Sequence, residues 1–288
     1  MNRREQRRRA EVFRGLHEAP PILVLPNAWD VVSARIFELE GFKAIGTTSA
    51  GIAATLGYPD GQQMSLQETA AVVLRIKRCL RVPLSADIEA GYSETPEGVV
   101  EAMRAVLDAG AVGVNLKDSA CDGVGPLHDE DLQCEKIAAM RGAATSEGIP
   151  LVINARTDVY LLPDGDPAER LRHAIRRGNT YKNAGADCVF VPDAGDLNRE
   201  PIASLVREID APLNVIMGPQ TPPIGELEEI GVARVSIGPR PLRALLALLR
   251  RIARELRDSG TCTARSTESL TYAEVNALFD ARAGGRHR

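Results

Sequence analysis

The chain has 288 residues, of which 44% are hydrophobic and 26% charged, and its formal net charge is −4. That length accommodates one large barrel or two modest domains, and the slightly acidic balance gives no reason to expect a nucleic-acid partner. No apolar run reaches the roughly 18 residues of a membrane span, so we expect no membrane partner either. The five cysteines are scattered without a CxxC pair. This argues against a disulfide framework or a structural zinc site and favours a reducing, cytoplasmic location.

Short apolar runs alternate with helix-length segments as far as about residue 258. The basic opening, residues 3–9, predicts a solvated first helix or a frayed terminus. Several runs, such as residues 151–153, are apolar at consecutive positions, which is typical of strands buried on both faces of a parallel sheet. We predict eight strands, at residues 22–25, 44–48, 83–87, 112–117, 151–156, 188–192, 213–216 and 234–237.

The segments between these strands carry a helical period. In residues 168–184, apolar side chains fall on one side and most basic ones on the other. Gly110 and Gly185 each stand in an Ala-Gly-Ala sequence just before a strand, so we expect each to end a helix in the left-handed conformation. This repeated unit occurs in β/α barrels and in doubly wound sheets. The count of eight strands, with no GxGxxG or Walker loop, favours the (β/α)₈ TIM barrel.

We assign residues 1–260 to this barrel as the catalytic domain and residues 261–288 to a C-terminal tail. The last barrel helix is predicted at residues 241–257, and a short amphipathic helix at residues 272–279. The tail has too few apolar residues for a core of its own, so we expect it to pack on a partner or to fray.

Polar and ionisable residues follow nearly every predicted strand. In a β/α barrel the carboxyl ends of the strands carry the active site, and this ring exceeds what a structural barrel requires. Some members are well placed as helix caps, namely Asp30, Asp118 and Asp193. The members that we predict to bind substrate are Thr48, Ser49, Ala50, Asp87, Asn154, Arg156, Asp193 and Asn214.

Two features of the ring indicate particular chemistry. Asp60, Asp87 and Glu89 offer carboxylate oxygens, which suit Mg²⁺ or Mn²⁺, although a set of cap and loop carboxylates is an equal alternative. Arg156 directly follows an apolar strand. We expect its guanidinium to point into the barrel mouth and to bind a carboxylate or phosphate in bidentate fashion. A structural ion pair with Asp158 or Asp87 is the weaker alternative.

Seven short motifs follow one another along about residues 20–260. They are Leu25-Pro-Asn-Ala-Trp-Asp30, Gly41-Phe-Lys-Ala-Ile45, Thr48-Ser-Ala-Gly51, Leu56-Gly-Tyr-Pro-Asp60, Ala86-Asp-Ile-Glu-Ala-Gly-Tyr92, Gly113-Val-Asn-Leu116 and Asn154-Ala-Arg-Thr-Asp158. Together they resemble the isocitrate lyase/phosphoenolpyruvate mutase superfamily, in the branch often labelled carboxyvinyl-carboxyphosphonate phosphorylmutase. The resemblance implies a barrel whose last helix is swapped onto a neighbour in a homodimer or homotetramer. It also implies Mg²⁺, a 2-oxo acid substrate and an enolate intermediate.

The resemblance also assigns roles to individual positions. Residues 48–50, by themselves only a weak sign of an anion-binding nest, match the stretch that holds the substrate carboxylate and the enolate oxygen. Asp60 and Asp87 match metal-binding carboxylates, and Arg156 matches the arginine that binds the anionic end of the substrate.

The metal-binding positions depart from the family pattern at two places. Ser85 stands where the family keeps its direct metal ligand, and Lys117 stands where it keeps a glutamate. An ammonium at that place weakens Mg²⁺ binding, because like charges repel at short range. Either Glu89 joins the metal site, which we favour, or Lys117 itself replaces the cation.

The gating loop, residues 119–127, also departs from the pattern. It lacks the Lys-x-Asn arrangement of phosphonomutases, and Cys121 lacks the basic neighbours and histidine found beside the acid/base cysteine of the carbon–carbon lyases. Cys121 is therefore a candidate proton donor, with an ordinary loop thiol as the favoured alternative. Pro192-Asp-Ala194 resembles the Pro-Glu-Ala of the lyases.

These observations lead to three hypotheses. The first is a Mg²⁺-dependent lyase that acts on a small 2-oxo or 2-hydroxy (di)carboxylate through a pyruvate-type enolate, with Arg156, Lys117 and Cys121 as catalytic candidates. The second is a phosphonomutase or phosphonate-processing enzyme. The third is a catalytically degenerate protein that binds 2-oxo acids, suggested by Ser85 and Lys117.

Overall fold

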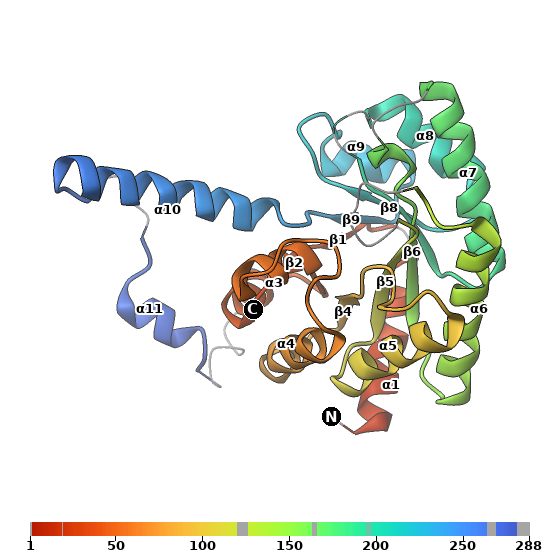
Figure 1. Cartoon of the computed structure of the whole chain (residues 1–288), viewed down its shortest axis with the longest axis horizontal. Helices are drawn as coiled ribbons and strands as arrows, with labels where there is room; N and C mark the ends of the chain where they lie inside the picture. The colour runs from red at the N-terminus through yellow and green to blue at the C-terminus, as the bar shows by residue number, and fades with distance from the viewer. Residues whose placement is uncertain are drawn as a thin grey trace.

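The computed structural model describes residues 2–18, 20–119, 126–162, 166–193, 195, 197–263 and 269–280. Within these ranges, nine parallel strands form one sheet in the order β1-β9-β8-β7-β6-β5-β4-β3-β2 (Figure 1). β1 (Leu23–Leu25) pairs with β9 (Arg234–Ser236), and β2 (Asn27–Ala28) pairs with β3 (Ile45–Thr47). β1 and β2 are two halves of one barrel strand, so the sheet closes into the predicted eight-stranded barrel.

The break between β1 and β2 lies at Pro26. Proline has no N–H to donate to a neighbouring strand, but its carbonyl still accepts a hydrogen bond from Gly46 N at 2.9 Å. The eight predicted strands are confirmed, but the sequence pattern did not predict this break. The remaining strands are β4 (Leu84–Asp87), β5 (Gly113–Lys117), β6 (Val152–Arg156), β7 (Cys188–Val191) and β8 (Leu213–Ile216).

Helices surround the barrel and follow the predicted pattern. Gly110 and Gly185 have φ angles of 100° and 112°, which confirms their expected left-handed conformation. The helices are α1 (Arg3–Gly15), α2 (Val31–Leu39), α3 (Ser49–Leu56), α4 (Leu66–Cys79), α5 (Pro96–Asp108), α6 (Glu130–Ser146), the 3₁₀ turn η1 (Val159–Leu161), α7 (Pro167–Asn183), α8 (Arg199–Glu208), α9 (Ile224–Ile230), α10 (Arg240–Ser259) and α11 (Tyr272–Ala277).

The first helix covers the amino-terminal end of the barrel. The sequence suggested a solvated or frayed segment, and the outer arginines of α1 are indeed exposed. Its inner face, however, is buried at Ala10 and Phe13. A Cβ atom at Gly113, the first residue of β5, would lie 2.5 Å from the Phe13 ring, so the strand needs glycine there. Because α1 closes this end, the opposite end of the barrel is left for a site.

His17, just beyond α1, is buried against the same end of the barrel. Its Nδ1 lies 2.9 Å from the carbonyl of Phe13 and therefore donates to it, which leaves Nε2 to face Arg234 Nη1 at 3.4 Å. Burial, and then the positive charge of Arg234, lowers the pKa of His17 to about 3. The folded protein therefore holds His17 neutral at every pH above that value.

We expect this neutral histidine to make the fold less stable in mild acid. Below about pH 6.5 the unfolded chain binds a proton at His17 that the folded chain does not, so unfolding becomes easier by about 1.4 kcal/mol for each further pH unit. Urea unfolding at pH 7 and pH 5 should show a smaller loss of stability in His17→Gln than in the wild type. Equal pH slopes in the two proteins would contradict the assignment.

α10 leaves the barrel instead of packing on it (Figure 1). Leu242 is its one buried residue, whereas Leu245, Leu249 and Leu256 are 54%, 60% and 51% exposed. The chain then returns to the barrel after α11, where Arg35 Nε on α2 donates to the Leu278 carbonyl at 2.8 Å. In the described part of the chain, no helix is long and apolar enough to cross a membrane.

Candidate active site

A cavity of about 200 Å³ opens at the carboxyl ends of the strands. Every strand of the closed barrel contributes to it, from Asn27 on β2 to Ser236 on β9. Eight predicted site residues line it, namely Thr48, Ser49, Ala50, Asp60, Asp87, Arg156, Asp193 and Asn214. Lys117, Glu89 and Asn154 lie outside this lining, and Cys121 lies outside the described residues.

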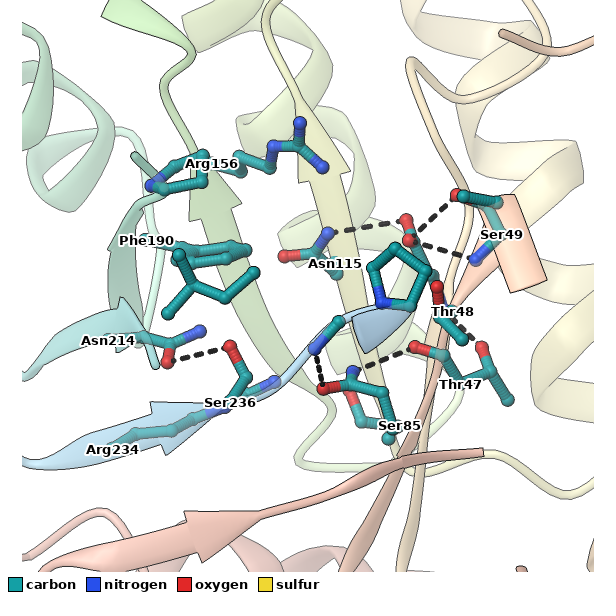
Figure 2. A pocket seen from close by; sticks show the side chains of 18 of the residues that line it. Thr47, Thr48, Ser49, Ser85, Asn115, Arg156, Phe190, Asn214, Arg234 and Ser236 are labelled. Carbon is teal, nitrogen blue, oxygen red and sulfur yellow. Dashed lines mark hydrogen bonds between the residues drawn. The ribbon is translucent and has the colours of Figure 1, made fainter. Parts of the chain in front are cut away.

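Asp87, at the end of β4, is held from four directions. Its Oδ2 accepts from the Ser49 backbone N at 3.2 Å and from Ser49 Oγ at 2.9 Å. Its Oδ1 accepts from Asn115 Nδ2 (Figure 2) and from the Glu89 backbone N, both at 3.2 Å. A carboxylate has about four acceptor positions, so these contacts occupy all of them.

Glu89 and Lys117 form a buried ion pair beside this carboxylate. Lys117 Nζ lies 2.9 Å from Glu89 Oε2, and the two side chains are 6% and 5% exposed. Glu89 has a φ of 54°, and its Oε1 accepts from the Gln62 backbone N at 3.3 Å. Burial and the negative charge of Asp87 raise the pKa of Glu89, against the opposing charge of Lys117.

Two of the three predicted metal ligands, Asp87 and Glu89, fit a divalent cation poorly. The hydrogen bonds of Asp87 occupy its acceptor positions, Glu89 is neutralised by Lys117, and Ser85 offers only a hydroxyl. Mg²⁺ takes one or two direct carboxylates and completes its ligands with water, so Asp60, which lines the cavity, is the remaining predicted ligand. No group of three or more His, Cys, Asp or Glu side chains within the described ranges could hold a metal ion. The Mg²⁺ site therefore stays a prediction that this geometry does not support.

Arg156 lies at the cavity with an ion-pair partner of its own. Its Nε donates to Asp158 Oδ1 at 2.5 Å and its Nη2 to Asp158 Oδ2 at 3.1 Å. The structural ion pair with Asp158, which was the weaker alternative on sequence grounds, is therefore present. Burial works against the charge of Arg156, but the charges of Asp158 and Asp87 outweigh it and raise its pKa. The Phe190 ring centroid lies 5.7 Å from the guanidinium carbon. Asp158 uses two of the five guanidinium N–H groups.

The start of α3 forms another wall of the cavity. Thr48 is the N-cap, and its Oγ1 accepts from Gly51 N at 3.4 Å. Thr48 N donates to the Ala28 carbonyl at 3.0 Å, and Ser49 N and Oγ are directed at Asp87, so the backbone N–H of Ala50 is the one left for a ligand among these three residues. The positive end of a helix favours an anion at this place.

The predicted amide and acid residues divide into two groups. Asn154 lies behind the cavity, where its Nδ2 donates to Asn115 Oδ1 at 2.9 Å and so orients the Asn115 amide toward Asp87. Asn214 lines the cavity and faces Ser236 Oγ at 3.4 Å. Asp193 also lines it, but its carboxylate accepts from the backbone of the following turn at Leu197.

The structure tests the predictions that Asp30 and Asp118 cap helices. Asp30 caps α2, with Ser33 N donating to its Oδ1 at 2.7 Å. Asp118 is not the N-cap of any helix within the described residues, so its assignment as a cap was wrong. Instead its fully buried carboxylate accepts from Tyr181 Oη at 2.7 Å and from Arg177 Nη1 at 3.0 Å.

Five further residues line the cavity, namely Asn27, Ser85, Asn115, Arg234 and Ser236. The sequence placed Asn27 and Arg234 in the polar ring and Ser85 at the metal-ligand position of the family, but it gave none of the five a substrate-binding role. For Arg234 and Ser236 a signal was present, because alternate residues of a strand share one face. Two polar residues two apart within an apolar run therefore mark one polar side of β9.

The profile of the phosphoenolpyruvate phosphomutase family matches residues 13–257. The chain belongs to the isocitrate lyase/phosphoenolpyruvate mutase superfamily. This superfamily member is 36% identical over 266 residues to an uncharacterized protein of Mycobacterium tuberculosis, which covers 92% of this chain and 95% of that protein. It is 30% identical over 262 residues to the 2-methylisocitrate lyase of Bacillus subtilis, covering 86% of this chain and 82% of that enzyme.

Solved structures agree with this assignment. A candidate lyase/mutase from Burkholderia cenocepacia is 34% identical and superposes with a TM-score of 0.87 over 97% of this chain and 98% of that one. A 2,3-dimethylmalate lyase shares the fold, with a TM-score of 0.80 at 24% identity over 94% of each chain. The named relatives are lyases and mutases, so this superfamily member is an enzyme. The resemblance to the superfamily implies Mg²⁺, so the poor fit of Asp87 and Glu89 to a cation distinguishes this chain from that expectation.

Proposed function

We propose that this enzyme is a carbon–carbon lyase that acts on a small 2-oxo or 2-hydroxy acid through a pyruvate-type enolate. The observation that carries the proposal is the small cavity of about 200 Å³, which has Arg156 on one wall and the start of α3 on another. Both features attract anions. The similarity to 2-methylisocitrate lyases supports the same class of reaction.

Each wall of the cavity has a part in this chemistry. In a 2-hydroxy acid the hydroxyl loses its proton to solvent and its oxygen forms the carbonyl of one fragment as the carbon–carbon bond breaks. The electron pair of that bond passes to the other fragment, which becomes the enolate and then takes up a proton at carbon. The Ala50 N–H and the positive end of α3 would stabilise the developing negative charge. Arg156 would hold a carboxylate of the substrate. Cys121 is the candidate proton donor, with an ordinary loop thiol as the favoured alternative.

A second candidate is phosphonate chemistry, favoured by the match to the phosphoenolpyruvate phosphomutase profile. One set of incubations separates the two. Oxaloacetate, 2-methylisocitrate and phosphonopyruvate are each supplied with Mg²⁺ and with a chelator, and the products are followed by proton and phosphorus NMR. Cleavage of a carbon–carbon bond supports the lyase, and loss of the phosphonate signal supports the alternative. Binding of 2-oxoglutarate with no turnover would support a degenerate binding protein and contradict both.

We also propose that the enzyme is a homodimer or homotetramer that covers the leucines of α10 with a second copy. These leucines are too exposed for an isolated chain, because contiguous apolar patches of this kind mark interfaces. The superfamily resemblance implies that the last barrel helix is swapped between neighbouring subunits, and α10 is that helix.

Replacing Leu249 by aspartate is expected to reduce the oligomer to monomers, because a buried charge at the centre of an apolar contact is costly. Light scattering after size-exclusion chromatography measures the mass. Ser259→Asp adds the same charge at the end of the same helix and should leave the mass unchanged. An unaltered mass for Leu249→Asp would contradict the proposed interface.

A further inference from the structure

Arg234 is a buried cation at the inner end of the cavity. Its side chain on β9 lines the cavity, although the residue is only 3% exposed. Among the residues that the structure describes it has no carboxylate within ion-pair distance, and its Nε has no hydrogen-bond partner. His17, the neighbour of Nη1, is neutral and so cannot balance the charge.

Nearby acids do not compensate this charge. The fully buried Cys188 has a pKa raised by burial to about 12, so it is a neutral thiol. Asp87 is the carboxylate whose charge acts on Arg234, but four hydrogen bonds already bind its oxygens. Burying a cation without a partner is unfavourable, and Arg234 lines a space that admits a ligand.

Two further polar atoms of the cavity lack partners. Asn214 Nδ2 and Ser85 Oγ are buried and make no hydrogen bond within the described chain. Asn214 and Arg234 are directly paired residues of β8 and β9. Figure 2 shows Asn214, Arg234 and Ser236 together on the side of the cavity opposite Ser49. A guanidinium with amide and hydroxyl donors is the set that a carboxylate prefers.

We propose that Arg234, with Asn214, forms a second anion subsite that binds the far carboxylate of a short dicarboxylate substrate. The first carboxylate would lie at Arg156 and α3, so this inference rests on the proposed function and names its substrate class. A carboxylate at Arg234 supplies the missing counter-charge, which makes a dianion preferred over a monoanion of the same length.

The test measures binding without turnover. Isothermal titration calorimetry compares succinate with butyrate, and malonate with propionate, on the wild type, on Arg234→Met and on the exposed control Arg172→Met. We expect the wild type to bind the better dicarboxylate at least tenfold more tightly than its monoanion. Arg234→Met should abolish this preference, and Arg172→Met should behave as the wild type. If Arg234→Met fails to fold, Asn214→Leu serves as the test in its place. This variant keeps the buried arginine and should weaken dicarboxylate binding.

Each outcome bears on one proposal. Equal affinity for dianions and monoanions in the wild type, or a dicarboxylate preference that survives Arg234→Met, would overturn the subsite. Tighter binding of phosphonoacetate than of malonate would overturn its assignment to a carboxylate. Arg234-dependent dicarboxylate binding without cleavage of any tested acid would uphold the subsite and reject the lyase.

Discussion

Replacing Lys117 by methionine is expected to destabilise the folded enzyme by roughly 3–5 kcal/mol, the cost of leaving one member of a buried ion pair without its partner. Glu89 lies 2.9 Å from the Lys117 ammonium, and both side chains are almost fully buried. Without Lys117, only burial and the charge of Asp87 would act on the carboxylate, and both raise its pKa. Urea unfolding of the wild type and the variant at pH 7 measures the difference.

The loss in Lys117→Met should depend on pH in a definite direction. A carboxyl group whose pKa is raised in the folded state destabilises the fold once pH exceeds its unfolded value, so the defect should grow from pH 5 to pH 8. The double variant Lys117→Met/Glu89→Gln removes both charges and should recover most of the stability. A double variant no more stable than the single one would show that the pair is not the cause.

The fold was largely predictable because its main signal is local. Strands such as β6 and β7 are buried on both faces, so runs of consecutive apolar residues predict them. Gly110 and Gly185 ended helices as expected, since left-handed backbone favours glycine there. The break at Pro26 was not predicted, because it is recognised only from the strand pairing. β1 pairs with β9 before the break, and β2 pairs with β3 after it.

The site was predictable in its location but less so in its pairings. The strand ends placed Arg156 and Asp87 at one cavity, as barrel geometry requires. What each acid contacts depends on backbone angles that no spacing reveals. The left-handed conformation of Glu89 accompanies its pairing with Lys117, although the sequence suggested a metal ligand. Arg234 needed the register of β8 and β9 to place it inside the barrel.

Replacing Arg156 by glutamine is expected to lower kcat/KM for the cleaved acid by about 10²–10³-fold, with most of the change in KM. Removing a charged partner of a buried carboxylate costs about 2–5 kcal/mol, and a contact made in both ground and transition states affects KM most. Arg156→Lys keeps the charge but not the two-pronged geometry, so it should fall between the wild type and Arg156→Gln. Steady-state kinetics, with thermal unfolding to verify the fold, gives both parameters.

The ion pair with Asp158 supplies a control for this experiment. Arg156 holds Asp158, whose Oδ2 also accepts from Ser119 Oγ at 2.5 Å, so an effect on the substrate must be separated from an effect on this contact. Asp158→Asn weakens the ion pair without removing the guanidinium, and its KM should stay within a few-fold of the wild type. If Asp158→Asn raises KM as much as Arg156→Gln does, Arg156 acts by positioning Asp158. The carboxylate-binding role would then pass to Arg234 and the start of α3 alone.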